Sequence, residues 1–142
     1  MKYTTKTEYG LICLVYMASR NSQAPITIKE LAQEEKYSQT YIEKILQSLR
    51  AARIVHSHQG KQGGYVLARK PSAITLKEII EALEGSTFDV FCEPEARDQI
   101  VCTHLCLCGV KPIWKKTRHM LDEFYDGITL EQIASKTILQ NV

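Results

Sequence analysis

The first half of the chain carries apolar residues three and four positions apart, which is the spacing of amphipathic helices. The pattern predicts helices at about 4–19, 27–35 and 38–52. The run Thr27-Ile28-Lys29-Glu30 has the form of a capping box, and Ser38 is a favoured N-cap residue. A short helix, a tight turn and a longer basic helix are typical of a helix-turn-helix, although an ordinary helical hairpin has the same spacing.

A β-hairpin pattern follows the third predicted helix directly. Residues 54–57 and 65–67 have the composition of short strands, and they flank a glycine-rich turn at 60–64. A hairpin straight after a helix-turn-helix is the arrangement of a winged helix. The predicted fold is therefore mainly α with a small β-wing, a winged helix-turn-helix followed by a long dimerisation helix.

Helical spacing returns in the second half of the chain. Capping patterns that begin at Thr75 and Thr129 each predict a short helix, the first ended by Gly85. Between them, a long helix is predicted from about Pro112 to Tyr125. Its many apolar residues favour a homodimer, since winged-helix readers use two-fold symmetry to meet paired half-sites. Packing on the chain's own first helix is the alternative.

The resulting division is a winged-helix domain at 1–84, a cysteine-rich loop at 85–109, and a dimerisation helix with a C-terminal helix at 110–142. Charge follows this division. Residues 38–70 hold six lysines and arginines against one acid, a net charge of +5, which suits contact with phosphates. Residues 84–100 hold five acids against one arginine, a net charge of −4, so this loop is expected to face away from nucleic acid.

The chain has no apolar run of the roughly 20 residues that a membrane span needs, and its start lacks the apolar core of a signal peptide. We therefore expect a cytoplasmic protein with no membrane partner. An enzyme is not expected, because the sequence contains no nucleophile motif and no histidine–carboxylate constellation.

Four of the five cysteines fall within seventeen residues, and one histidine lies among them: Cys92, Cys102, His104, Cys106 and Cys108. Such a cluster predicts a metal centre, and sulfur ligands select zinc, copper(I) or iron–sulfur clusters. The absence of a Cys-x-x-Cys pair disfavours zinc, whereas the separate irons of a cluster accept wider spacing. A sensor that uses free thiols, or zinc, is the alternative. The fifth cysteine, Cys13, is expected to be a small buried hydrophobic residue of the first helix.

Several segments together resemble one family, the winged-helix repressors related to the iron–sulfur regulator IscR and the nitric-oxide sensor NsrR. The resemblance covers nearly the whole chain and rests on residues 9–11, 28–32, 38–46, 49–55, 63–68, 74–80 and 128–130. The Gly63-Gly64-Tyr65 wing behind that recognition-helix pattern is the most specific of these segments.

The resemblance implies a [2Fe–2S] or [4Fe–4S] cluster held by three loop cysteines, Cys92, Cys102 and Cys108. The gap between the first two is longer than usual in the family. Some relatives add a histidine where this chain has Lys111, and others add a carboxylate from the first helix of the partner subunit, at the position of Glu8. The fourth ligand is therefore open, in the order Glu8, Cys106 and His104.

The resemblance also implies a double-stranded DNA operator, with Thr40, Tyr41 and Glu43 at the major groove. A carboxylate such as that of Glu43 can accept a hydrogen bond from cytosine N4. A salt bridge to Lys44, Arg50 or Lys61 is the alternative for Glu43. Many relatives carry arginine where this chain has Gln59, a role that Lys61 partly replaces. The complete predicted DNA-binding set is Ser38, Gln39, Thr40, Tyr41, Glu43, Lys44, Arg50, Gln59, Gly60, Lys61, Gly63, Gly64 and Tyr65.

The sequence thus predicts a DNA-binding transcription regulator. Its operator affinity would be controlled by a cluster that senses iron–sulfur status, redox state or nitric oxide. The alternative is a regulator of the same fold that senses through thiols or zinc.

Overall fold

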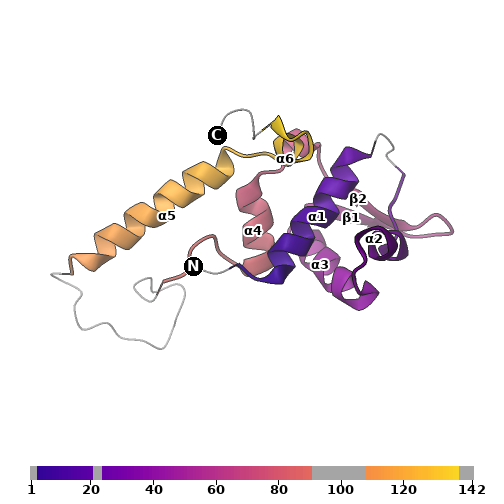
Figure 1. Ribbon diagram of the computed structural model, residues 1–142, viewed down its shortest axis with the longest axis horizontal. Coiled ribbons are helices and arrows are strands. Elements are labelled where there is room, and N and C mark those ends of the chain that lie inside the picture. The colour runs from indigo at the N-terminus through magenta and orange to yellow at the C-terminus, as the bar shows by residue number, and fades with distance from the viewer. Residues whose placement is uncertain (1–2, 21–23, 91–107, 138–142) are drawn as a thin grey trace.

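Six α-helices, one short 3-10 helix and two strands make up the residues that the computed structural model describes, which are 3–20, 24–90 and 108–137 (Figure 1). Their order confirms the predicted winged helix-turn-helix with a small β-wing. The bounds are α1 Thr5–Ser19, α2 Ile28–Glu35, α3 Gln39–Ala51, β1 Val55–His58, β2 Gly64–Leu67, η1 Pro71–Ala73, α4 Leu76–Glu84, α5 Val110–Asp126 and α6 Leu130–Ala134.

Threonine N-caps begin four of the helices, as the capping patterns predict for three of them. The capping boxes at Thr75 and Thr129 are complete, with the N3 side chain bonded back to the N-cap amide. At Thr27 only half of the predicted box forms, in which the hydroxyl accepts from the Glu30 amide at 3.0 Å. The Glu30 carboxylate instead accepts from Arg20 and Tyr16, so it joins α2 to the end of α1.

Ser38 is the N-cap residue of α3, as predicted, but its side chain makes no capping hydrogen bond. The first turn is held by backbone bonds to the Ser38 carbonyl, and the position of the helix is held by its buried face. Burial therefore decides where α3 lies.

The hydrophobic core lies between α1, α3, α4 and α6. The core-facing stripe of α3 is fully buried and has strict helical spacing: Ile42, Ile45, Leu46 and Leu49. Cys13 is also fully buried, as expected. Helix α1 approaches α4 closely at Gly10, where a Cβ atom would lie 2.4 Å from Leu83 Cδ1. The absence of a side chain at Gly10 thus permits this helix contact.

An isolated β-bridge attaches the wing to the helical part of the chain. Strands β1 and β2 pair antiparallel from Val55↔Leu67 to His58↔Gly64. Ile26, just before α2, forms a bridge with Tyr65 through two backbone hydrogen bonds of 2.9 and 2.8 Å. A Cβ on Gly64 would lie 2.5 Å from the Ile26 carbonyl oxygen, so this close approach requires glycine.

Helix α6 returns to the winged-helix part of the chain. Leu130 is fully buried in the core, and Thr129 pairs with Thr75 in a short bridge. The Leu76 amide bonds to the Ile128 carbonyl at 2.8 Å, and the Leu130 amide bonds to the Ile74 carbonyl at 2.9 Å. We refer to residues 3–90 and 128–137 together as the head. The predicted division groups α6 with α5 in residues 110–142, and in the structure α6 contacts α1 and η1.

Helix α5 extends away from the head (Figure 1). Most of its contacts with the head go to α4 and to the residues that follow α4, and Tyr3, just before α1, adds one more. Trp114 meets Phe88 with ring centroids 5.9 Å apart, Lys77 pairs with Asp122 at 3.7 Å, and Tyr125 bonds to Tyr3 at 2.6 Å. Among the described residues, these contacts attach the long helix to the head along one side.

None of the helices in the described ranges is long and apolar enough to cross a lipid bilayer.

Candidate nucleic-acid interface

The turn between α2 and α3 sets the direction of α3. Lys36 closes α2 in the left-handed conformation, with φ of 57°, and the Tyr37 amide bonds back to the Ala32 carbonyl at 3.1 Å. The buried stripe of α3 then fixes its rotation. Its opposite face is solvent-exposed and polar, formed by Gln39, Thr40, Glu43, Lys44 and Gln47. Four of these five residues belong to the predicted DNA-binding set.

Glu43 is an exposed carboxylate on that face. Its Oε1 atom accepts a 3.5 Å hydrogen bond from Gln47 Nε2, one helical turn further on. Among the described residues it forms no salt bridge, so the ion pair considered for it with Lys44, Arg50 or Lys61 is absent there. The carboxylate remains accessible as a hydrogen-bond acceptor.

Tyr41 lies at the edge of this surface and is half-buried against α1. Its ring meets Tyr9 edge-on with centroids 5.5 Å apart, and its hydroxyl lies 3.2 Å from Thr5 Oγ1. Tyr9 in turn stacks on Tyr37 at 3.9 Å. Tyr41 therefore joins α3 to α1, and only part of its side chain faces outward.

The wing supplies a second exposed surface. Its tip exposes Gln59, Gly60 and Lys61, and Gly60 has a φ of 123° that a side chain would disfavour. Arg50, in the last turn of α3, donates to Ser57 Oγ on β1 at 3.3 Å. This bond ties the recognition helix to the wing. Tyr65, by contrast, is half-buried against the core and uses its backbone to bond Ile26, so it supports the wing away from its tip.

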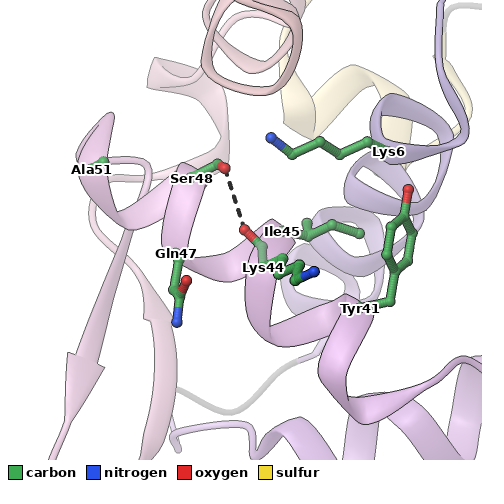
Figure 2. A pocket seen from close by; sticks show the side chains of 7 residues that line it. All are labelled: Lys6, Tyr41, Lys44, Ile45, Gln47, Ser48 and Ala51. Atoms are coloured by element: carbon green, nitrogen blue, oxygen red, sulfur yellow. Dashed lines mark hydrogen bonds between the residues drawn. The ribbon is translucent and has the colours of Figure 1, made fainter.

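A hollow of about 560 Å³ opens between α3 and the start of α1 (Figure 2). It is bordered by Lys6, Tyr41, Lys44, Ile45, Gln47, Ser48 and Ala51. The predicted DNA-binding set includes only two of these seven residues, Tyr41 and Lys44. Gln47 follows Glu43 by one helical turn, so its place on the exposed face was a readable signal. Lys6 comes near α3 only through packing of distant segments, and no local pattern marks it.

The predicted metal ligands divide between described and undescribed parts of the chain. Cys92, Cys102, His104 and Cys106 lie outside the described residues. Cys108 is half-buried just before α5, and Glu8 is exposed on α1. Over the ranges that the structure covers, no group of three or more His, Cys, Asp or Glu side chains is arranged to hold a metal ion.

Cys13 does not belong with the loop thiols. It is fully buried in α1, where desolvation and the nearby Glu35 raise the pKa of its thiol to about 11. Because the thiolate is the reactive form, this cysteine is chemically inert near neutral pH. A sensing role for thiols would have to come from the other cysteines.

Comparison with known proteins identifies the family. A family model described as an iron-dependent transcriptional regulator, Rrf2, matches residues 3–136. The chain belongs to the Rrf2 family of transcriptional regulators. Its resemblance to IscR-type winged-helix regulators is confirmed, because a solved structure of IscR from T. potens superimposes with a TM-score of 0.71 at 30% identity, covering 96% of this chain and 88% of that one.

Two further members are similar in sequence over most of their length. The transcriptional regulator CymR of Bacillus subtilis is 35% identical over 139 residues, covering 96% of this chain and 92% of CymR. Its structure, described as that of the global cysteine regulator, covers 96% of this chain and 98% of that one, with a TM-score of 0.75 at 34% identity. Protein rrf2 of Nitratidesulfovibrio vulgaris is 35% identical over 133 residues, covering 94% of this chain and 87% of that protein.

Proposed function

We propose that this Rrf2-family regulator binds operator DNA as a homodimer and that an iron–sulfur cluster controls its operator affinity. The observation that carries the DNA-binding proposal is the exposed polar face of α3, whose Glu43 carboxylate has no salt-bridge partner among the described residues. Thr40, Glu43 and Gln47 would read base edges, since side chains of this kind bond to exposed groups in the major groove. Lys44, Arg50 and the wing tip around Lys61 would contact the backbone.

The dimer is proposed to form along α5. Val110, Ile113, Met120 and Phe124 lie three, seven and four residues apart, so they share one face of the helix, with Thr117 at the position between Ile113 and Met120. This is the spacing of a coiled-coil seam with one polar position. The four apolar residues are exposed, with exposed fractions of 46% for Val110, 60% for Ile113, 60% for Met120 and 61% for Phe124. A second copy of α5 would cover this seam and set the spacing of the two recognition helices. Half-sites one helical turn apart would then be read together.

The cluster would be held by Cys92, Cys102 and Cys108, with Glu8, Cys106 or His104 as the fourth ligand. In a single chain the start of α5, next to Cys108, extends away from α1 (Figure 1), so a Glu8 ligand would come from the other copy of the chain. Thiolate donors suit such a cluster, which supplies a reversible response to iron, oxidants or nitric oxide when bound. Cys108 adjoins α5, so ligation there bears directly on the proposed dimer helix.

The second candidate is sensing through cysteine thiols or zinc without a cluster. It is favoured by the similarity to CymR, whose solved structure is described as that of a global cysteine regulator. The DNA-binding surface and the α5 seam would be the same in both cases. Only the chemistry of the 85–109 segment would differ.

Anaerobic purification followed by an absorbance spectrum and by iron and sulfide analysis separates the two candidates. Visible bands with near-equal iron and sulfide support the cluster, and Cys108→Ala should lose both. A protein that stays colourless after reconstitution contradicts the cluster and favours thiols or zinc. Cys13→Ala is the matched control, since this buried cysteine should leave the spectrum unchanged.

DNA binding is tested separately by selecting bound sequences from a pool of random duplexes. We expect enrichment of a two-fold symmetric site, and Thr40→Ala should relax the preference at one position in each half-site. Failure to enrich any sequence, with a protein that is folded by circular dichroism, would contradict the operator-binding proposal.

A further inference from the structure

We propose that Lys6 is a DNA-backbone contact that completes the interface on the side of α3 away from the wing. The inference rests on the proposed DNA-binding function and adds a contact from α1, a third element beside the recognition helix and the wing. Its ligand is a phosphodiester group of the duplex, held by Lys6 together with Lys44.

The two lysines reach one hollow from two different helices. Lys6 extends from the first turn of α1, and Lys44 lies on the exposed face of α3; both border the hollow (Figure 2). In the described portion of the chain, neither ammonium group takes part in a salt bridge. The charge of Lys6 also helps to lower the pKa of the Glu84 carboxyl, so this ammonium group has an acidic neighbour. Two ammonium groups without a salt bridge that border one open hollow can bind an anion between them, because a lysine binds phosphate as a point charge.

The start of α1 is fixed in place beside α3. Oε1 of Glu84, at the end of α4, accepts hydrogen bonds from the Thr4 amide at 2.9 Å, the Thr4 hydroxyl at 2.7 Å and the Thr7 hydroxyl. We call these three bonds the Glu84 cap. They place a protein carboxylate at the N-terminus of α1, so an external anion would be bound by the lysine side chains rather than by the helix end.

A second link holds Lys6 close to the recognition helix. Thr5, its neighbour in sequence, lies 3.2 Å from the Tyr41 hydroxyl, as measured between the two oxygen atoms. The Glu84 cap and this contact bracket Lys6 on both sides in sequence. The backbone of Lys6 is therefore held beside α3, and only its side chain is free to move the ammonium group.

The position relative to the wing indicates DNA as the source of the phosphate. In Figure 2 the strands of the wing lie on one side of α3 and Lys6 lies on the other. A helix in the major groove, about 12 Å wide, has a phosphate backbone on each side. The wing would follow one backbone, and Lys6 with Lys44 would meet the other. The hollow opens beside the polar face of α3, where a duplex would lie.

The test is the salt dependence of binding to a duplex from the selection above and to a scrambled duplex. The plot of log K against log salt has a negative slope, and the loss of one phosphate contact makes this slope less steep by about 0.9. We expect Lys6→Gln to reduce the slope by about this amount and to weaken both duplexes by the same factor. Lys6→Arg should retain the slope. Lys136→Gln, an exposed lysine after α6, is the matched control and should behave as the unchanged protein.

The outcomes separate this inference from the proposed function. If the unchanged protein binds neither duplex, both proposals fail. If it binds and Lys6→Gln keeps the full slope, the Lys6 contact alone is wrong. Calorimetry with inorganic phosphate at constant ionic strength tests whether the hollow binds free phosphate instead of DNA. If phosphate binding depends on Lys6 while Lys6→Gln leaves the salt dependence of DNA binding unaltered, the hollow is a free-anion site and the proposal is overturned. Equal thermal midpoints for all variants exclude misfolding as the cause.

Discussion

The head and helix α5 bury their apolar residues to very different extents. In the head, whole stripes such as Ile42, Ile45, Leu46 and Leu49 have no exposed surface. In α5, Tyr125 is the one buried residue of seventeen, while Ile113, Met120 and Phe124 are each about 60% exposed. Full burial of such a side chain contributes about 1.5–3 kcal/mol. The head gains this stabilisation within one chain, whereas the exposed apolar residues of α5 do not gain it among the described residues.

The largest expected effect comes from opening the core of the head. Leu46→Ala removes a fully buried side chain and should lower the free energy of unfolding by about 2–5 kcal/mol. Urea denaturation followed by circular dichroism measures this loss. Gln47→Ala, the adjacent exposed residue, should change stability by no more than about 0.5 kcal/mol. Similar losses for the two variants would contradict the arrangement of α3.

The next effect concerns α5 and should leave the head intact. Ile113→Glu introduces a carboxylate into the proposed seam and removes an apolar contact, so the dimer dissociation constant should rise by about 100-fold or more. Light scattering across a concentration series measures the mass. Lys115→Glu, an exposed residue off the seam, is the control and should keep the dimer. A monomeric unchanged protein, or an Ile113→Glu protein that stays dimeric, would show that the seam is not the interface.

The attachment of the wing to the head offers a smaller, local test. Gly64→Ala brings a Cβ within 2.5 Å of the Ile26 carbonyl and should cost more than about 1 kcal/mol, with weakened DNA binding. Gly60→Ala at the wing tip meets no atom within 4 Å, so it should cost only the backbone preference, about 1 kcal/mol. Amide hydrogen exchange at Tyr65 should increase in the first variant and stay slow in the second.

The smallest effect is acid sensitivity at the Glu84 cap. Burial alone would raise the pKa of Glu84, but the hydrogen bonds from Thr4 and Thr7 outweigh it and leave the pKa below its ordinary value. A lowered folded-state pKa stabilises the head above the unfolded value of about 4.3, and this stabilisation is lost as the pH falls through the folded value. Urea unfolding at a series of pH values from 7 downward should find Glu84→Gln less stable than the unchanged protein near neutral pH, and the difference should shrink as the pH falls through the folded-state pKa of Glu84. A difference that does not shrink on acidification would contradict the role of the ionised carboxylate.

Local signals in the sequence predicted the elements of the head well. Complete capping boxes at Thr75 and Thr129, and the glycine stop at Gly85, act within a few residues and can be read directly. The prediction of a complete capping box at Thr27 was wrong in detail, because the Glu30 carboxylate bonds to Arg20 and Tyr16 of another segment instead of to the Thr27 amide. Which atoms a side chain bonds depends on tertiary neighbours that no local pattern specifies.

The same limit applies to the candidate interface. Thr40, Glu43 and Lys44 were predictable because one helix presents them together. The packing of α6 into the head, the bridge from Ile26 to Tyr65 and the approach of Lys6 to α3 all join residues far apart in the chain. The predicted ligands Cys92, Cys102, His104 and Cys106 lie outside the described residues, so their grouping stays a prediction.

The bridge between Ile26 and Tyr65 also limits how this protein can be recombined with its relatives. A wing transplanted as residues 55–67 alone would arrive without the strand contact that holds its second strand. Exchanging the segment before α2 together with the wing would keep the two sides of this bridge matched. For protein engineering, and for natural recombination, the wing and the segment before α2 are thus best exchanged together, with α3 lying between them in the sequence.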